Sequence, residues 1–205
     1  QRKKLGNSDL HISEITFGCM SLEADQSNAN HLIDKAVDHG INLFDTADLY
    51  QKGYNEEMVG KALQGKRNKV LIATKVGNQL SPDGNGWDWN PTKSYILTAV
   101  ENSLKRLQTD FIDLYQLHGG TIDDPIDETI EAFELLKNQG KIREYGISSI
   151  RPNVIREYIR RSQISSNMMQ FSLLDRRPEE SCFESLKNEG IGVLARGTLA
   201  QGLLT

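Results

Sequence analysis

Two patterns of apolar residues alternate along this chain: short apolar runs, and segments in which apolar residues recur every three to four positions. Short, mostly apolar runs such as Ile15–Met20 and Val70–Val76 are typical of strands that are covered on both faces. Leu32, Ile33 and Ala36 instead recur at helical spacing. Strands that alternate with helices favour right-handed crossovers and a parallel sheet. The pattern therefore predicts an α/β protein built from repeated strand–helix units.

Seven strands and the six helices between them can be counted. The expected strands start near residues 15, 42, 70, 112, 144, 167 and 192. The expected helices cover Ser27–His39, Asn55–Gln64, Thr92–Leu107, Ile126–Gln139, Pro152–Arg160 and Pro178–Glu189. An N-terminal β-hairpin is expected over Lys4–Glu14, because Asn7-Ser8-Asp9 separates two short semi-apolar pieces.

This order predicts a TIM (β/α)8 barrel with an N-terminal β-hairpin that lacks its last C-terminal βα part. A closed barrel needs eight units and about 250 residues, whereas this chain has 205. An open doubly wound sheet is the structural alternative, but no Gly-x-Gly-x-x-Gly turn follows the first strand. We expect residues 1–205 to form a single, C-terminally incomplete barrel domain.

The charge and composition of the chain limit the kinds of binding partner that can be expected. The formal net charge is −4, and no basic stripe is long enough to follow phosphates, so we expect neither nucleic acid nor an anionic membrane as a partner. Cys19 and Cys182 lie too far apart in sequence to indicate a disulfide framework or a metal cluster. There is no apolar signal core and no run of about 18 apolar residues. These features predict a cytoplasmic protein without a metal site.

Four polar groups stand at the ends of consecutive strands: Asp45, Tyr50, Lys75 and His118. In a barrel the carboxyl ends of the strands converge on one mouth, so these groups can meet around one small substrate. A lysine ammonium beside a phenol stabilises the phenolate. Taken singly, each residue also has a structural interpretation, such as an ion pair, a helix cap, a turn or a half-buried aromatic. Their joint placement favours a proton donor that faces a carbonyl group.

These residues lie in stretches that resemble the aldo-keto reductase family. The stretches are FDTADLY, NEEMVGKAL, ATKVG and IDLYQLHGGTIDDPIDETIEAFELLKNQGKIREYGISS, and they are closest to bacterial reductases of the general-stress and inositol-operon type. The resemblance implies that Asp45, Tyr50, Lys75 and His118 are the catalytic residues and that Tyr50 is the general acid. It also implies a nicotinamide cofactor that delivers hydride to the carbonyl carbon.

The resemblance further implies a cofactor-binding set. Its members are Gly18, Cys19, Met20, Asp45, Ser148, Ser149, Gln170, Arg196, Gly197 and Leu199. Arg196 stands where many members have a tyrosine that stacks on the nicotinamide, and its guanidinium could stack or meet the pyrophosphate. NADPH is the expected cofactor from the habit of the family. NADH is not excluded, because the family's 2′-phosphate segment follows the last residue of this sequence.

Met20, Trp87 and Trp89 are the expected substrate contacts. The two tryptophans lie in the loop Gly77–Asn90, which resembles a mobile wall for an apolar substrate, or else packs onto the barrel rim. Aspartates 123, 124 and 127 are expected to begin and cap the helix at Ile126 rather than to bind a metal.

The main functional hypothesis is an NADPH-dependent aldo-keto reductase that acts on a small aldehyde or ketone. The alternative is a nucleotide-binding regulatory module like the β-subunits of potassium channels, with weak or no turnover. A third interpretation is a sugar-phosphate isomerase or aldolase barrel, which would need a phosphate-binding loop. The sequence leaves the physiological substrate and the oligomeric state open.

Overall fold

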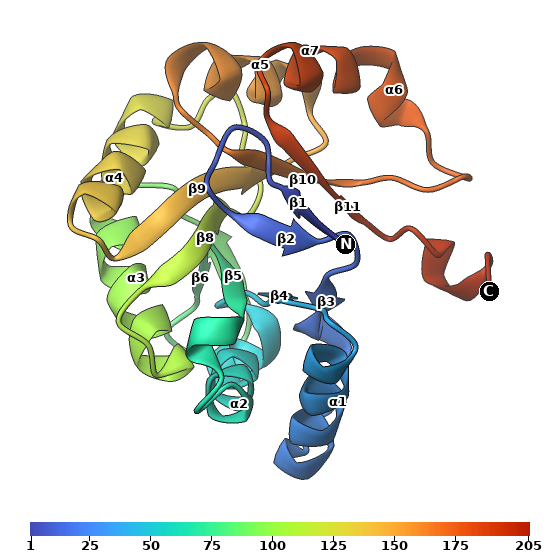
Figure 1. Ribbon diagram of the computed structural model, residues 1–205. Helices are drawn as coiled ribbons and strands as arrows, with labels where there is room; N and C mark the ends of the chain where they lie inside the picture. Colours follow the sequence, from blue (N-terminus) through green and yellow to red (C-terminus); the bar gives the residue numbers. More distant parts are fainter.

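A curled sheet of seven parallel strands forms the centre of the computed structural model, which describes residues 1–205 (Figure 1). The strands are β3 (Phe17–Gly18), β4 (Leu43–Asp45), β5 (Leu71–Val76), β8 (Ile112–Leu117), β9 (Ile142–Ser148), β10 (Ser166–Gln170) and β11 (Gly192–Arg196). Neighbours in the sheet follow the order β3-β4-β5-β8-β9-β10-β11, and every pair is parallel. The sheet is open between β3 and β11, and it confirms the barrel architecture with seven strands.

Helices cover the outer face of this sheet (Figure 1). They are α1 (Gln26–Asp38), α2 (Tyr54–Ala62), α3 (Lys93–Leu107), α4 (Ile126–Asn138), α5 (Pro152–Arg161), α6 (Arg177–Ser181) and α7 (Phe183–Asn188). Local chemistry sets several of their ends: the Asp25 carboxylate accepts hydrogen bonds from the first turn of α1, and the Thr92 hydroxyl does so for α3. None of these helices combines the length and the apolar character needed to cross a bilayer.

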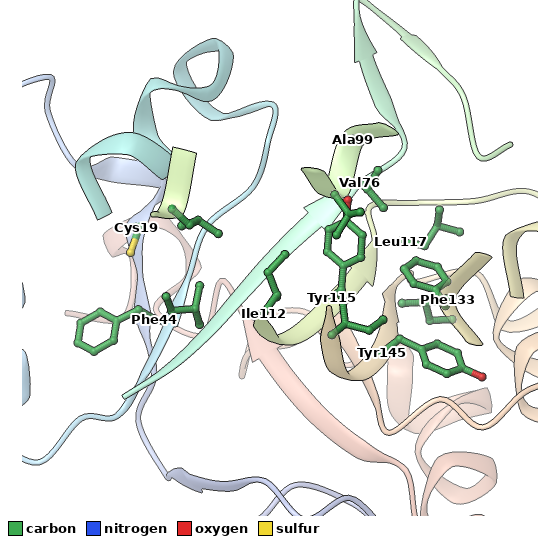
Figure 2. Packing of buried hydrophobic residues seen from close by; sticks show 14 of the residues in the cluster. Cys19, Phe44, Val76, Ala99, Ile112, Tyr115, Leu117, Phe133 and Tyr145 are labelled. Atoms are coloured by element: carbon green, nitrogen blue, oxygen red, sulfur yellow. The ribbon is translucent and has the colours of Figure 1, made fainter. Parts of the chain in front are cut away.

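Two apolar layers flank the sheet. The larger contains 36 buried residues between the strands and the helices. Within it Phe133 of α4 stacks on Tyr145 of β9, with ring centroids 5.3 Å apart, and meets Tyr115 of β8 edge-on (Figure 2). The smaller layer, which includes Leu43, Leu114 and residues of the N-terminal hairpin, holds only eight, so most of the apolar burial comes from the helical layer.

The N-terminal hairpin pairs β1 (Arg2–Lys4) with β2 (His11–Ser13) in antiparallel register, as predicted. The side chain of Asn42 ties it to the sheet: its amide nitrogen donates to the His11 carbonyl at 2.8 Å, and its oxygen accepts from the Ser13 amide at 2.6 Å. Asn42 directly precedes β4. The hairpin therefore lies against the amino ends of the strands, opposite the ends that carry the candidate site.

Three local predictions need correction. The loop 77–90 contains a second hairpin, β6 (Asn78–Leu80) with β7 (Trp87–Trp89). The expected helix Pro178–Glu189 divides into α6 and α7, because the buried Cys182 has a φ of −115° that departs from helical geometry. The expected first strand shortens to two residues, which pair with β4 alone.

Candidate active site

Lys75 lies at the centre of the site and is almost fully buried. Its ammonium Nζ donates to Asp45 Oδ2 at 2.8 Å and to the Thr46 carbonyl at 2.7 Å, and it lies 3.5 Å from Tyr50 Oη. Asp45 ends β4 and Lys75 belongs to the neighbouring strand β5, so parallel pairing brings the two charges together. A buried charge is tolerated only when it is paired and hydrogen-bonded, and Lys75 meets both conditions.

Tyr50 and His118 complete the group. Tyr50 opens the short 3-10 turn Tyr50–Gly53, in which Gln51 and Lys52 adopt positive φ values of 50° and 56°. His118 follows β8. The two rings meet edge-to-face with centroids 5.9 Å apart, while Lys75 Nζ lies 5.1 Å from the centroid of the Tyr50 ring. The structure therefore brings all four predicted residues together, although they come from three separate strand ends.

Burial shifts the pKa values of the ionisable side chains in this group. Burial raises the pKa of the Asp45 carboxyl, against the opposing effect of the Lys75 charge. Burial alone would lower the pKa of Lys75, but Asp45 and Tyr50 reverse that effect and leave it raised, so the ammonium persists. Burial, together with the positive charges of Lys75 and Arg196, lowers the pKa of His118 to about 3. His118 is consequently a neutral imidazole at neutral pH.

A cavity of about 440 Å³ opens beside His118. Its wall is formed by Asn78, Trp87, Trp89, His118, Gly119, Gly120, Thr121, Ser148, Ser149, Ile150, Arg151, Met168 and Arg196. A space of this size is typical of a small-molecule site. The cavity unites the segments that follow β5, β8 and β9 with Arg196 at the carboxyl end of β11, which is the face where barrel enzymes hold their substrates.

Trp89 is anchored in the wall of this cavity. Its indole Nε1 donates to Asp124 Oδ1 at 2.9 Å, and Thr121 donates to the same carboxylate through its amide and its hydroxyl. Asp124 was expected to cap α4, and that prediction is wrong: Pro125 is the N-cap residue, and no side chain caps the helix. Asp127 lies in the first turn of the helix, as expected, and also pairs with Arg161.

The predicted cofactor residues fall into two groups. Ser148, Ser149 and Arg196 line the cavity, and Gly18 lies beside Asp45 in the sheet register. Gln170 Oε1 accepts from Arg196 Nη1 at 2.8 Å. Any side chain at Gly197 would come within 2.8 Å of Gln170, so glycine suits that position.

The other seven residues of that set do not line the cavity, and Cys19, Met20 and Leu199 are placed least like ligand contacts. Cys19 is fully buried, and burial raises the pKa of its thiol, so we expect it to be unreactive. Met20 is 62% exposed and Leu199 is 56% exposed. The structure therefore does not bring Met20 to the cavity as a substrate contact.

Sequence reasoning missed Asn167 on β10. Its side-chain amide donates to the Ser149 carbonyl at 3.1 Å, and its oxygen accepts from the Ser149 amide at 3.3 Å. These two bonds hold the backbone of Ser149 at the edge of the cavity. The available signal was a polar residue within a buried strand, but the partner is 18 positions away and could not be identified from sequence.

The polar atoms of the site fit a nicotinamide cofactor. Asp45 Oδ1 and His118 Nδ1 are buried without a hydrogen-bond partner in the protein. A side chain at Gly18 would meet no atom within 4 Å, so there is open space along the backbone beside Asp45. Unpaired buried acceptors and open space above backbone are what a polar ligand requires. No three histidine, cysteine or acidic side chains gather in a metal-binding arrangement.

Comparison with known proteins defines the class. Residues 14–205 match the model of the aldo/keto reductase family. The chain belongs to this family, whose members are NAD(P)H-dependent oxidoreductases.

Individual relatives are similar over the whole chain or nearly so. The uncharacterized oxidoreductase YqkF of Bacillus subtilis (strain 168) is 58% identical over 205 residues, which are 100% of this chain and 67% of that protein. The holo form of the aldo-keto reductase AKR11C1 from Bacillus halodurans superposes with a TM-score of 0.98 at 60% identity, covering 100% of this chain and 68% of that one. An aldo/keto reductase from Klebsiella pneumoniae in complex with NADP and acetate has a TM-score of 0.83 at 30% identity, covering 94% and 66%. The chain thus spans about two thirds of the length of its relatives.

Proposed function

We propose that the protein is an NADPH-dependent aldo-keto reductase that reduces an aldehyde or ketone, with Tyr50 as the general acid. The observation that carries this proposal is the position of the Lys75 ammonium, 2.8 Å from Asp45 Oδ2 and 3.5 Å from Tyr50 Oη. This arrangement places a positive charge beside the phenol that must lose a proton. The reaction can also run in reverse, so that a polyol or another alcohol is oxidised at the same site.

Each residue has a separate task in this mechanism. When bound, the nicotinamide ring supplies the hydride that reduces the carbonyl carbon. Tyr50 donates its hydroxyl proton to the carbonyl oxygen, and Lys75 stabilises the phenolate that remains. Asp45 keeps Lys75 charged and in place. His118 is neutral, so its N–H can orient the carbonyl oxygen without competing as an acid.

NADPH is the proposed cofactor. The Klebsiella pneumoniae relative is described in complex with NADP, and the residues of this chain that line the cavity provide hydroxyls and a guanidinium suited to a carboxamide and a phosphate. We assign Ser148 and Ser149 to the carboxamide side, Arg196 to the phosphate side, and the Gly18 backbone with Asp45 to the ribose. Gln170 would act through its hydrogen bond to Arg196.

The other functional hypotheses receive less support. The relatives are named as oxidoreductases and reductases, which favours neither a regulatory module nor an isomerase or aldolase. The cytoplasm remains the proposed compartment, because Cys19 and Cys182 are both buried and unpaired, as in a reducing environment.

Tyr50→Phe tests the proposal. Removing the phenolic hydroxyl should lower the rate of carbonyl reduction by about 10²–10⁴-fold, because general acid catalysis is worth that much. NADPH binding, measured by fluorescence quenching on the full-length gene product, should be nearly unchanged. Tyr54→Phe is the matched control, since Tyr54 is an exposed tyrosine at the start of α2 and is not among the hydrogen-bond partners of Lys75. Wild-type turnover in the Tyr50 variant would exclude Tyr50 as the proton donor.

A further inference from the structure

The cavity beside His118 carries positive charge and no negative charge. Arg151 and Arg196 are the charged residues of its wall, and none of the wall residues is an aspartate or a glutamate. His118 adds no charge at neutral pH, because its pKa is lowered to about 3. A cavity whose wall carries two guanidinium groups and no carboxylate favours an anionic occupant over a neutral one.

Arg151 is positioned by the loops that form this wall. Its backbone amide donates to Ser149 Oγ at 3.2 Å, and its side-chain Nη1 donates to the Gly120 carbonyl at 2.5 Å. Gly120 comes two residues after His118, so the guanidinium is anchored to the same loop as a proposed catalytic group. The remaining donors of the guanidinium have no partner in the protein, which leaves them available to a ligand.

Three other arginines from the same part of the chain are neutralised by acids: Arg143 pairs with Asp113, Arg160 with Glu157, and Arg161 with Asp127. Arg151 and Arg156 form no ion pair, and of these two only Arg151 lines the cavity. The nearby carboxylate of Asp124 is already occupied by Trp89 and Thr121. Arg151 is therefore an uncompensated charge at the wall of the cavity.

We propose that Arg151 forms an anion subsite and that the preferred carbonyl substrates carry a carboxylate or phosphate group. This inference rests on the proposed reductase function and names its substrate class. Arg196 is already assigned to the phosphate side of the cofactor, so Arg151 is the cation left for the substrate. The planar guanidinium suits the oxygens of a carboxylate or a phosphate. The anionic group would lie near Arg151 while the carbonyl faces His118 and Tyr50.

The first test compares anionic and neutral carbonyls of matched shape on the full-length gene product with NADPH. One pair is 4-oxobutanoate and its methyl ester, and the other is glyceraldehyde 3-phosphate and glyceraldehyde. We expect kcat/KM to favour the anionic member of at least one pair by about tenfold or more, as hydrogen bonds to charged groups allow. The pair that shows the preference identifies carboxylate or phosphate as the group that is recognised. Equal kcat/KM values within both pairs would overturn the proposal.

Substitutions of Arg151 test whether this residue causes the preference for anionic substrates. Arg151→Gln should reduce the ratio of anionic to neutral kcat/KM by about tenfold, mainly through KM, whereas Arg151→Lys should retain part of it because the charge remains. Arg156→Gln is the matched control: Arg156 is exposed on α5, the helix that Arg151 precedes, and does not line the cavity. An unchanged ratio in Arg151→Gln, or an equal loss in Arg156→Gln, would contradict a local subsite.

A binding measurement separates this inference from the proposed function. Titration calorimetry of the NADP⁺-loaded protein with butanoate and with the neutral butanamide should show tighter binding of butanoate, and Arg151→Gln should remove the difference. If the wild type shows this difference but reduces no carbonyl, the subsite stands and the reductase function fails. If carbonyls are reduced but neither binding nor kcat/KM depends on the anionic group, the function stands and the subsite fails.

Discussion

Lys75 shows how one residue can depend on its whole surroundings. Its ammonium is held by a carboxylate, a backbone carbonyl and a phenol from the segment 45–50, yet it lies on a different strand. Removing one partner of a buried pair is far more costly than removing an exposed one, because an uncompensated charge remains. The arrangement is therefore constrained by folding as well as by the proposed chemistry.

His118 should make stability depend on pH. In the unfolded chain an ordinary histidine has a pKa near 6.5, whereas burial, Lys75 and Arg196 lower the pKa of His118 to about 3. Between these values the unfolded chain binds a proton that the folded chain does not. The contribution of His118 to stability is therefore complete above pH 6.5 and is lost as the pH falls toward 3, by up to about 1.4 kcal/mol per pH unit.

Urea unfolding of wild type and His118→Gln at pH values from 7.5 to about 4.5 measures this effect. The free energy of unfolding of the wild type should fall more steeply below pH 6.5 than that of the variant. Parallel curves for the two proteins would show that His118 is protonated as readily in the folded state as in the unfolded state.

At the scale of elements, the β6–β7 hairpin shows how one side chain positions a loop. Trp89 packs so closely over Gly77 that a Cβ atom there would lie 2.6 Å from the indole, and Gly77 has a φ of 122°. The indole N–H reaches Asp124, in the loop after β8. The hairpin after β5 is thus fastened to the loop that follows His118, and this wall of the cavity is held in place.

Asp124→Ala should release this wall. We expect an increased KM for bulky aromatic aldehydes, by several-fold, and a red-shifted tryptophan emission, because Trp89 loses a charge-assisted hydrogen bond worth about 1.5–3 kcal/mol. NADPH affinity should not change. Asp123→Ala provides the control, since Asp123 is the exposed neighbour. Identical emission and KM in the Asp124 variant and the wild type would mean that packing alone positions Trp89.

At the scale of the whole molecule, the N-terminal hairpin joins the two ends of the chain. Gly6 has a φ of 56°, and a Cβ atom there would lie 2.5 Å from the Gly192 amide nitrogen and from the Ser165 carbonyl oxygen. The turn of the hairpin therefore packs directly against the starts of β10 and β11. Because the first residues contact the last strands, we propose that residues 1–205 form one folding unit.

Gly6→Ala should destabilise the entire protein. The clash is with backbone atoms that cannot move aside, so we expect a loss of about 2 kcal/mol or more in the free energy of unfolding. Gly65→Ala is the control, because Gly65 also has a positive φ, of 73°, but open space around it. That variant should lose only about 1 kcal/mol. Equal losses in the two variants, measured by urea unfolding, would show that the hairpin contact contributes little.

Much of this structure follows from local sequence. The order of strands and helices, the N-terminal hairpin and the placement of Asp45, Lys75 and His118 at strand ends could be predicted, because apolar periodicity depends on near neighbours. The hairpin within 77–90 was missed, since its strands are only three residues long and are not apolar on alternate positions. The prediction for Asp124 failed because a carboxylate that precedes a helix can either cap that helix or bind another group. The position of Trp89, which only the tertiary structure shows, decides between the two.

The sequence by itself determined the seven strands, the six helical segments between them and the residue types that could carry reductase chemistry. Tertiary structure alone decided the separations in the site, the neutral state of His118, the bonds from Asn167 to Ser149 and the uncompensated charge of Arg151. The physical reason is the same in each case. Secondary structure arises from interactions over a few residues, whereas burial, pairing and pKa shifts depend on groups that the chain brings together from distant positions.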